Sequence, residues 1–139
     1  MNDIFTETCD KYGYVFKHNI LAFQKGPLSN WFGGSSGQSG GFKRSGIYYN
    51  CGEQYIMAEK ARLFNDDVSL AEILATTSPK KQKELGRKVQ NFNAEVWDYE
   101  KKFIASSCCQ YKTIHNPHIM KFIESIPPFC IIVEAGPLG

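Results

Sequence analysis

The spacing of apolar residues changes at about residue 52, and this change limits the chain to a fold that mixes strands and helices. Up to that point, short β-prone runs alternate with turn residues, at 14–16, 20–23, 41–44 and 47–49. Ser45-Gly46 joins the last two runs as in a hairpin. From there on, apolar residues recur every three or four positions, as in amphipathic helices. The run from Phe129 to Val133 then has the composition of a buried strand. We therefore expect an α+β domain that is mainly helical, with a small sheet built from the N-terminal strands and the C-terminal strand.

Capping and breaking residues divide the helical part into segments. Asp66-Asp67 is a natural stop and restart signal, and Ser78-Pro79 is an N-cap followed by proline at the first helical position. Asn93 is a second candidate cap. The predicted helices cover 52–64, 68–75, 79–90, a segment that follows Asn93, and a segment from Asn116-Pro117 to Ile126.

The composition fits one globular domain with its own core. The 139 residues are 42 % hydrophobic and include ten Phe, seven Tyr and two Trp. A net charge of +2 predicts neither strong attraction to nucleic acid nor repulsion from it. The N-terminus is too acidic and polar for a signal or transit peptide, and no apolar run reaches eighteen residues. We expect a soluble cytoplasmic protein without a membrane partner.

The five cysteines indicate free thiols. Their number is odd and their spacing matches no disulfide framework, which is typical of a reducing compartment. A zinc site that draws on them and on His115 and His118 is the alternative. The sequence has neither paired C-x2-4-C knuckles nor an H-E-x-x-H helix, the usual signals of such a site. We expect no metal and no cofactor.

A stretch of five glycines, three serines and one glutamine, residues 33–41, predicts a flexible loop. Such residues bury too little apolar surface to offset the entropy lost on ordering. The loop is either a tolerated surface insertion or a lid over a site. The lid is the more specific hypothesis. It rests on residues 28–32, just before the loop, whose sequence is more specified than a linker requires.

Glu53 and Lys60 form the most informative pair of polar residues. They are seven positions apart, so a helix returns them to nearly the same face two turns later. In a cleft, the carboxylate would move a proton, and the amine would attack a carbonyl carbon or hold an anion. The alternative is an ordinary solvated helix face, which Glu59 beside Lys60 also fits.

Three other features allow both a structural and a functional interpretation. The basic residues between 80 and 88 suit either phosphate groups or a solvated helix face. Trp97 lies on an apolar stripe, where core packing and base stacking are the alternatives. Glu134 follows five apolar residues at a strand end, where side chains commonly face a site.

The ordered motifs of residues 23–135 together resemble the NADAR/YbiA-like superfamily. The family's opening element and helix correspond to Leu28-Ser29-Asn30, Tyr48 and Glu53-Gln54-Tyr55 with Glu59-Lys60-Ala61. The next family motifs correspond to Ile73-Leu74, to Ser78-Pro79 with Lys83-x-Leu85-Gly86-Arg87, and to Trp97. The last correspond to Lys112, Asn116-Pro117 and Val133-Glu134-Ala135.

The resemblance implies an N-glycosidase that cleaves the bond between ribose C1 and a nitrogen. Its implied substrates are an N-ribosylated nucleotide intermediate of the riboflavin pathway or ADP-ribosylated guanine of nucleic acid. Lys60 would be the reactive amine and Glu53 the acid/base group. The substrate-binding residues implied are Asn30, Tyr48, Arg87, Trp97 and Glu134.

The sequence departs from the family pattern at several places. Gln54 stands where the family usually has histidine, and Ala135 is followed by only four residues instead of a D-x-x-W-G-x-G element. We therefore expect a single NADAR/YbiA-like domain over 1–139 that lacks the usual C-terminal motif. The alternative function is a catalytically impaired relative that binds a nucleotide, ADP-ribose or a protein partner without turnover.

Overall fold

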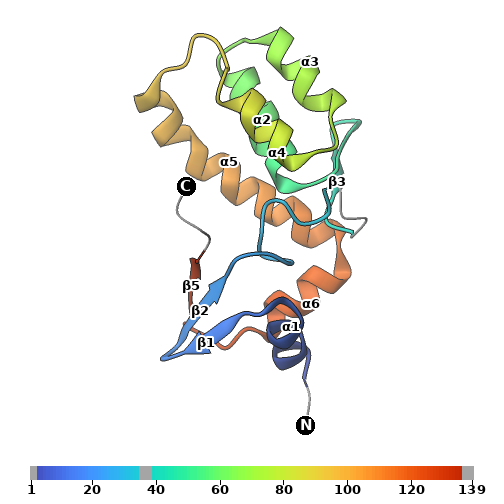
Figure 1. Cartoon of the computed structure of the whole chain (residues 1–139), viewed down its shortest axis with the longest axis vertical. Helices are drawn as coiled ribbons and strands as arrows, with labels where there is room; N and C mark the ends of the chain where they lie inside the picture. Colours follow the sequence, from blue (N-terminus) through green and yellow to red (C-terminus); the bar gives the residue numbers. More distant parts are fainter. Residues whose placement is uncertain (1–2, 35–38, 136–139) are drawn as a thin grey trace.

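The computed structural model describes residues 3–34 and 39–135, which form an α+β fold (Figure 1). Its helices are α1 (Ile4–Tyr12), α2 (Gly52–Leu63), α3 (Asp67–Ala75), α4 (Pro79–Gly86), α5 (Ala94–His115) and α6 (Pro117–Ser125). Its strands are β1 (Val15–Lys17), β2 (Ile20–Phe23), β3 (Phe42–Arg44), β4 (Ile47–Tyr49) and β5 (Ile131–Glu134). The mainly helical α+β class predicted from the sequence is confirmed.

The long helix α5 connects two groups of elements (Figure 1). At one end, α2 packs against α3, α4 and α5 around a core that contains Phe42, Tyr49, Ala58 and Ile73. At the other end, α1 and α6 pack against each other beside the strands β1, β2 and β5. No helix within 3–34 or 39–135 is both long and apolar enough to cross a lipid bilayer.

A three-stranded sheet joins the two ends of the chain, as the sequence predicts. Its order is β1-β2-β5, with β1 antiparallel and β5 parallel to β2. The strands β3 and β4 form a separate hairpin. Ser45 and Gly46 both have positive φ, 52° and 81°, which suits the tight turn predicted at these residues.

The helix caps predicted from the sequence are confirmed, but α4 is shorter than expected. The Ser78 hydroxyl accepts the Lys81 N–H at 3.3 Å, and the Asn93 side chain accepts the Val96 N–H at 3.2 Å. The helix α4 ends at Gly86, four residues before the predicted end. Beyond it, the Gln90 N–H donates to the Asp66 carboxylate at 2.8 Å, so a tertiary hydrogen bond replaces a helical one.

Two expectations about the ends of the chain are wrong. The first fifty residues contain the helix α1, which Asp3 caps by accepting the Thr6 N–H at 2.7 Å. The helix carries a short apolar stripe, Phe5, Cys9 and Tyr12, at helical spacing, which the interpretation of the first fifty residues as strands and turns overlooked. The strand β5 is exposed along its whole length, not buried. It pairs on one side only, as an edge strand of the described sheet.

The predicted loop at 33–41 is described only at its two ends, and the lid hypothesis falls on residues 35–38, outside the described part. Gly33 has φ 92° and lies against Gly40, where a Cβ would be 2.6 Å from the Gly40 Cα. The Ser39 hydroxyl donates to the Asn116 side-chain oxygen at 2.9 Å. Both ends are therefore held by the fold.

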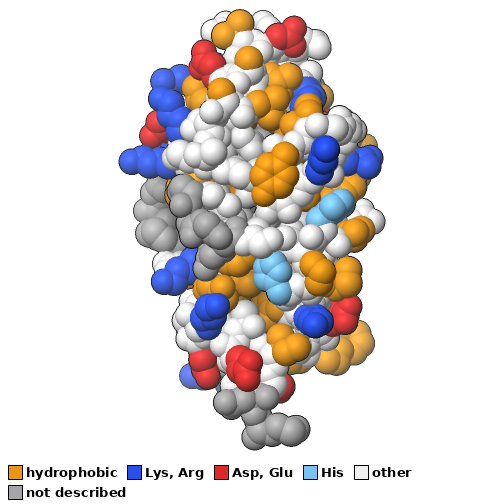
Figure 2. All heavy atoms as spheres, turned by 90° about the vertical axis from the view of Figure 1, so that its right-hand side faces the viewer, with side chains coloured by type: hydrophobic (Ala, Val, Ile, Leu, Met, Phe, Trp, Pro, Cys, Tyr) orange, Lys and Arg blue, Asp and Glu red, His pale blue; other side chains and the backbone are white. Residues whose placement is uncertain are grey.

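Charged side chains are dispersed over the face shown in Figure 2, where Lys and Arg side chains alternate with apolar and uncharged ones. This distribution fits the small net charge of +2. A single basic surface of the kind that binds nucleic acid without sequence preference is not seen on this face.

Gln54, the residue that replaces the family histidine, ties α2 to the end of α3. Its side chain is 4 % exposed. The amide nitrogen donates to the carbonyls of Ile73 at 3.0 Å and Thr76 at 3.1 Å, and the amide oxygen accepts the Asn50 N–H at 2.8 Å. Replacing it would leave several buried backbone groups without partners.

We expect Gln54→Ala to lower the free energy of unfolding by about 2–4 kcal/mol, because it removes these bonds and leaves a cavity. Urea denaturation followed by circular dichroism measures the change. Gln90→Ala, at an exposed side chain, is the control and should stay within about 0.5 kcal/mol of the parent. A loss below about 1 kcal/mol for Gln54→Ala would show that water replaces the amide.

Candidate active site

The carboxyl group of Glu53 lies buried in the first turn of α2. Its side chain is 8 % exposed. The Glu53 N–H donates to the Asn30 carbonyl at 2.8 Å, so the segment 28–32 lies at the start of the helix. The N-cap residue Cys51 makes no capping bond with its side chain. The Asn30 carbonyl therefore satisfies one of the free N–H groups at this helix end.

Burial raises the pKa of Glu53, and four charged side chains modify this effect. Lys83, Arg87 and Lys60 lower the pKa of Glu53, whereas Glu134 raises it. These groups come from α2, α4 and β5, so distant parts of the chain contribute to one electrostatic environment. The carboxyl end of β5 points toward the layer of α2, α3 and α4 (Figure 1).

The Lys60 amine lies between two aromatic rings. Its Nζ atom is 4.8 Å from the ring centroid of Phe92 and 5.3 Å from that of Trp97. Burial lowers the pKa of Lys60, the Glu53 carboxylate opposes that shift, and Arg87 adds to it. A lower pKa increases the fraction of neutral amine, which is the nucleophilic form.

Most of the residues singled out in the sequence occupy the same region. Glu53 and Lys60 share a face of α2, Arg87 acts on the pKa of both, and Glu134 acts on that of Glu53. The ring of Trp97 faces Lys60 and also packs against the core, so the two interpretations of this residue are compatible. The Asn30 side chain is at the start of α2, beside Gly52.

Tyr48 has different surroundings. It is 64 % exposed on β4, and its hydroxyl lies over Gly41, where a Cβ would collide with it. Within the described chain, no hydrogen bond or cation–π contact joins its side chain to Glu53 or Lys60.

Two residues at this site, Lys83 and Phe92, were not identified as site residues from the sequence. Lys83 is half-buried and acts on Glu53, although it looks like one member of a solvated basic run. Its spacing from Arg87, i and i+4, places Lys83 on the same side of α4 as this C-cap residue and was the available signal. Phe92 lies between α4 and α5, outside the helices, so the periodic spacing of apolar residues does not indicate it.

Lys112 is a buried cation that supports the segment before α2. It is 5 % exposed, and its amine donates to the Ser29 carbonyl at 2.8 Å. Burial lowers the pKa of Lys112 to about 8. Because Ser29 directly precedes Asn30, this bond fixes the backbone that meets Glu53.

We expect Lys112→Met to change how stability depends on pH. The pKa of Lys112 is about 8 in the folded protein and about 10.4 in an unfolded chain, so the folded state binds fewer protons between these values. Burying the charged amine lowers the free energy of unfolding by its full amount below pH 8, and this loss shrinks as the pH rises. Between about pH 7.5 and 9, the parent should gain about 1 kcal/mol of stability relative to the variant.

Urea denaturation of the two proteins at both pH values measures this difference. Other groups, such as the buried thiol of Cys108, titrate in both proteins and so largely cancel. A difference between the two proteins that does not vary with pH would show that Lys112 stays charged throughout.

Metal ligation has no visible basis in the part of the chain that the structure describes. Its His, Cys, Asp and Glu side chains form no group of three or more that could hold an ion. The five cysteines are all unpaired thiols, as expected from their spacing. The chemistry available at α2 is that of an amine and a carboxyl group.

Known proteins with similar sequences and folds were found for nearly the whole chain. The NADAR domain family model matches residues 16–137. The chain is 36 % identical to N-glycosidase R617 of Acanthamoeba polyphaga mimivirus over 126 residues, which are 89 % of this chain and 73 % of that protein. It is 32 % identical to Protein irg-1 of Caenorhabditis elegans over 92 residues, 58 % of this chain and 43 % of that protein.

A solved structure shares the fold. The NMR structure of the Escherichia coli protein YbiA matches with a TM-score of 0.68 at 21 % identity, over 87 % of this chain and 69 % of that one. The family match over residues 16–137 confirms the resemblance seen in the sequence. The chain belongs to the NADAR domain family, within the NADAR/YbiA-like superfamily.

Proposed function

We propose that this protein is an N-glycosidase that cleaves the bond between C1 of a ribose and a nitrogen of a base or exocyclic amine. Membership of the NADAR family and 36 % identity to a viral protein named an N-glycosidase support a glycosidase-type activity. The observation that carries the specific proposal is the pair on α2. Burial raises the pKa of Glu53 and lowers that of Lys60 on the same helix face.

These opposite shifts suit a reaction through an imine. Glu53 donates a proton to the ring oxygen, and the ribose opens to an imine between C1 and the base nitrogen. The neutral Lys60 amine adds to C1. Glu53 then moves a proton from the added amine to the base nitrogen, the C1–N bond breaks, and an imine joins Lys60 to the sugar. Water hydrolyses this imine, which releases the sugar aldehyde and restores Lys60.

The neighbouring residues would bind the substrate. Lys83 on α4 and Arg87 at its C-cap would hold a phosphate group, since the charges of both act on Glu53. The rings of Phe92 and Trp97, which already flank the Lys60 amine, would limit the access of water to it. Asn30 would contact the ribose from the start of α2. Glu134 would complete the pocket from β5, and Tyr48 is the peripheral member of the set.

Two substrate assays test the proposal. The protein is incubated with an oligonucleotide that carries ADP-ribosylated guanine and, separately, with the ribosylamino-pyrimidine of the riboflavin pathway. Liquid chromatography with mass spectrometry detects released ADP-ribose or ribose phosphate. Release in one assay identifies the substrate class, whereas two intact substrates contradict the proposed activity.

A binding protein without turnover is the second candidate, and the exposure of β5 favours it. Glu134 lies on a strand that is open to solvent along its length, so the described residues leave this side of the site unenclosed. This candidate predicts saturable binding of ADP-ribose by calorimetry while both substrates remain intact. Binding accompanied by release of the base rejects it.

A further inference from the structure

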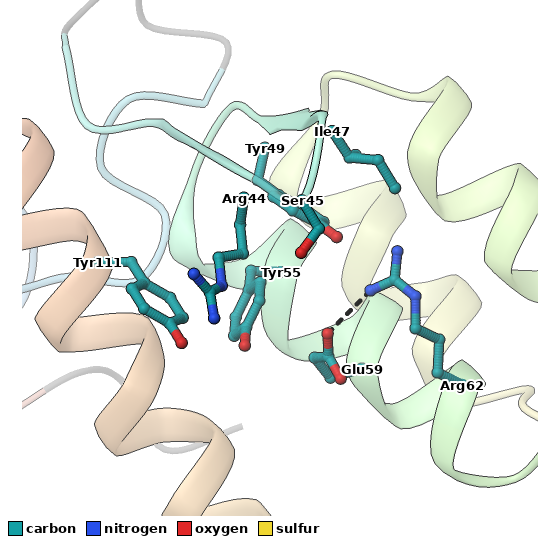
Figure 3. Close-up of a pocket in the computed structure, with 8 residues that line it drawn as sticks. All are labelled: Arg44, Ser45, Ile47, Tyr49, Tyr55, Glu59, Arg62 and Tyr111. Carbon is teal, nitrogen blue, oxygen red and sulfur yellow. Dashed lines mark hydrogen bonds and ion pairs between the residues drawn. The ribbon is translucent and has the colours of Figure 1, made fainter.

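A pocket lies on the face of α2 that points away from Lys60. It has a volume of about 390 Å³ and is enclosed by the β3–β4 hairpin, α2 and α5 (Figure 3). Tyr55, Glu59 and Arg62 line it from α2. With 3.6 residues per turn, these three positions lie about 100–180° around the helix from Glu53 and Lys60. The pocket is therefore separate from the site proposed for glycosidic cleavage.

Arg44 supplies a cation to this pocket that no carboxylate neutralises. Its guanidinium carbon is 4.5 Å from the ring centroid of Tyr111, and the group points between Tyr111 and Tyr55 (Figure 3). Among the described residues, no acidic group lies within ion-pair distance of it. Stacking on an aromatic ring leaves the N–H groups at the edge of a guanidinium free to bind a ligand.

Among the described residues that line the pocket, the one carboxylate is already engaged. Glu59 accepts a hydrogen bond from Arg62 at 2.9 Å (Figure 3). Because this pair is neutral as a unit, the remaining charge of the pocket is that of Arg44. An anion would therefore meet an unopposed cation rather than a carboxylate.

Phenol groups provide further hydrogen-bond donors. The hydroxyls of Tyr55 and Tyr111 end near the Arg44 guanidinium (Figure 3). Neither forms a hydrogen bond to another residue in the part of the chain that is described. Burial raises the pKa of Tyr55 to about 12, so this phenol keeps its proton at neutral pH. Ile47 adds an apolar wall.

We propose that this pocket binds the phosphate group of an organic phosphate, carried by a free nucleotide or by a nucleic-acid strand. The Arg44 guanidinium and the two phenols present donors next to one another to phosphate oxygens, which a single surface arginine does not (Figure 3). The aromatic and aliphatic walls would contact the organic part of the ligand. This proposal does not depend on the glycosidase activity, because none of its residues lies on the Lys60 face.

Calorimetric titration at low salt tests it with three probes, inorganic phosphate, AMP and a 12-nucleotide single-stranded DNA. We expect saturable binding that Arg44→Ala weakens at least tenfold. Lys43→Ala is the matched control, because it removes the same charge one position away, from a residue that does not line the pocket. It should change the affinity less than twofold. Tyr111→Phe keeps the ring under Arg44 and should weaken binding several-fold.

The three probes separate the sources of the phosphate. AMP binding that matches or exceeds DNA binding identifies a free nucleotide. Tighter DNA binding that falls steeply with salt identifies a strand. Absence of saturable binding, or equal losses in Arg44→Ala and Lys43→Ala, overturns the proposal. Loss of AMP binding in Lys60→Ala but not in Arg44→Ala would place the ligand on the other face and also overturns it.

Discussion

Lys60→Ala should reduce N-glycosidic cleavage on the order of 10³-fold or more while the fold survives. The substitution removes the amine that forms the covalent imine, and no neighbouring group replaces it. Its side chain is only partly buried, so the cost in stability is small. Single-turnover rates with whichever substrate the two assays identify measure the loss. Circular dichroism checks the fold. Lys88→Ala, which removes an exposed cation, is the control and should stay within about twofold.

Lys60→Arg distinguishes the two roles of the amine. Arginine keeps the positive charge but is not a nucleophile, because its guanidinium stays protonated in proteins. Full activity in this variant would mean that Lys60 only holds an anion. Borohydride reduction during turnover gives an independent readout. In the parent it should trap a mass adduct on the peptide that contains Lys60, and in either variant this adduct should be absent.

The local part of the site could be predicted from the sequence because it depends on helix geometry. Glu53 and Lys60 share a face wherever residues 52–63 are helical. The caps at Ser78 and Asn93 were equally local, since each involves a side chain and an N–H three residues later. The hairpin at Ser45-Gly46 follows from two residues that tolerate or favour positive φ in a tight turn.

The remaining part of the site depends on contacts between distant segments. Lys83 looks like its solvated neighbours in the sequence, and only the packing of α4 against α2 brings it to Glu53. Phe92 reaches Lys60 from a connection that has no periodic pattern. The burial of β5 was predicted wrongly because an apolar strand looks the same in the sequence at the edge of a sheet and in its centre.

The opposite pKa shifts of Glu53 and Lys60 have a quantitative consequence for the mechanism. The reaction needs Glu53 protonated and Lys60 neutral at the same time. In water, a carboxyl group loses its proton several pH units below the point where an amine does, so this combination is rare. Each unit by which the two pKa values approach each other makes the combination about tenfold more abundant. Burial of both groups shifts them in the required directions.

Glu53→Gln should therefore lower turnover by about 10²–10⁴-fold and change the shape of the pH profile. The amide keeps the size of the side chain but cannot transfer a proton. In the parent, activity should rise with pH up to the raised pKa of Glu53, stay level, and decline above the lowered pKa of Lys60 as the protonated carboxyl becomes too scarce.

In Glu53→Gln, the residual rate should rise through the pKa of Lys60 and then stay level, because only the amine still titrates. The midpoint of this rise should lie below the parent's alkaline midpoint, because the carboxylate that raises the pKa of Lys60 is gone. Single-turnover rates from pH 5 to 10 measure both features. Glu72→Gln, on the exposed side of α3, is the control and should keep the parent profile. An alkaline decline that persists in Glu53→Gln would assign the proton transfer to another group, for which Glu134, the carboxylate that raises the pKa of Glu53, is the candidate.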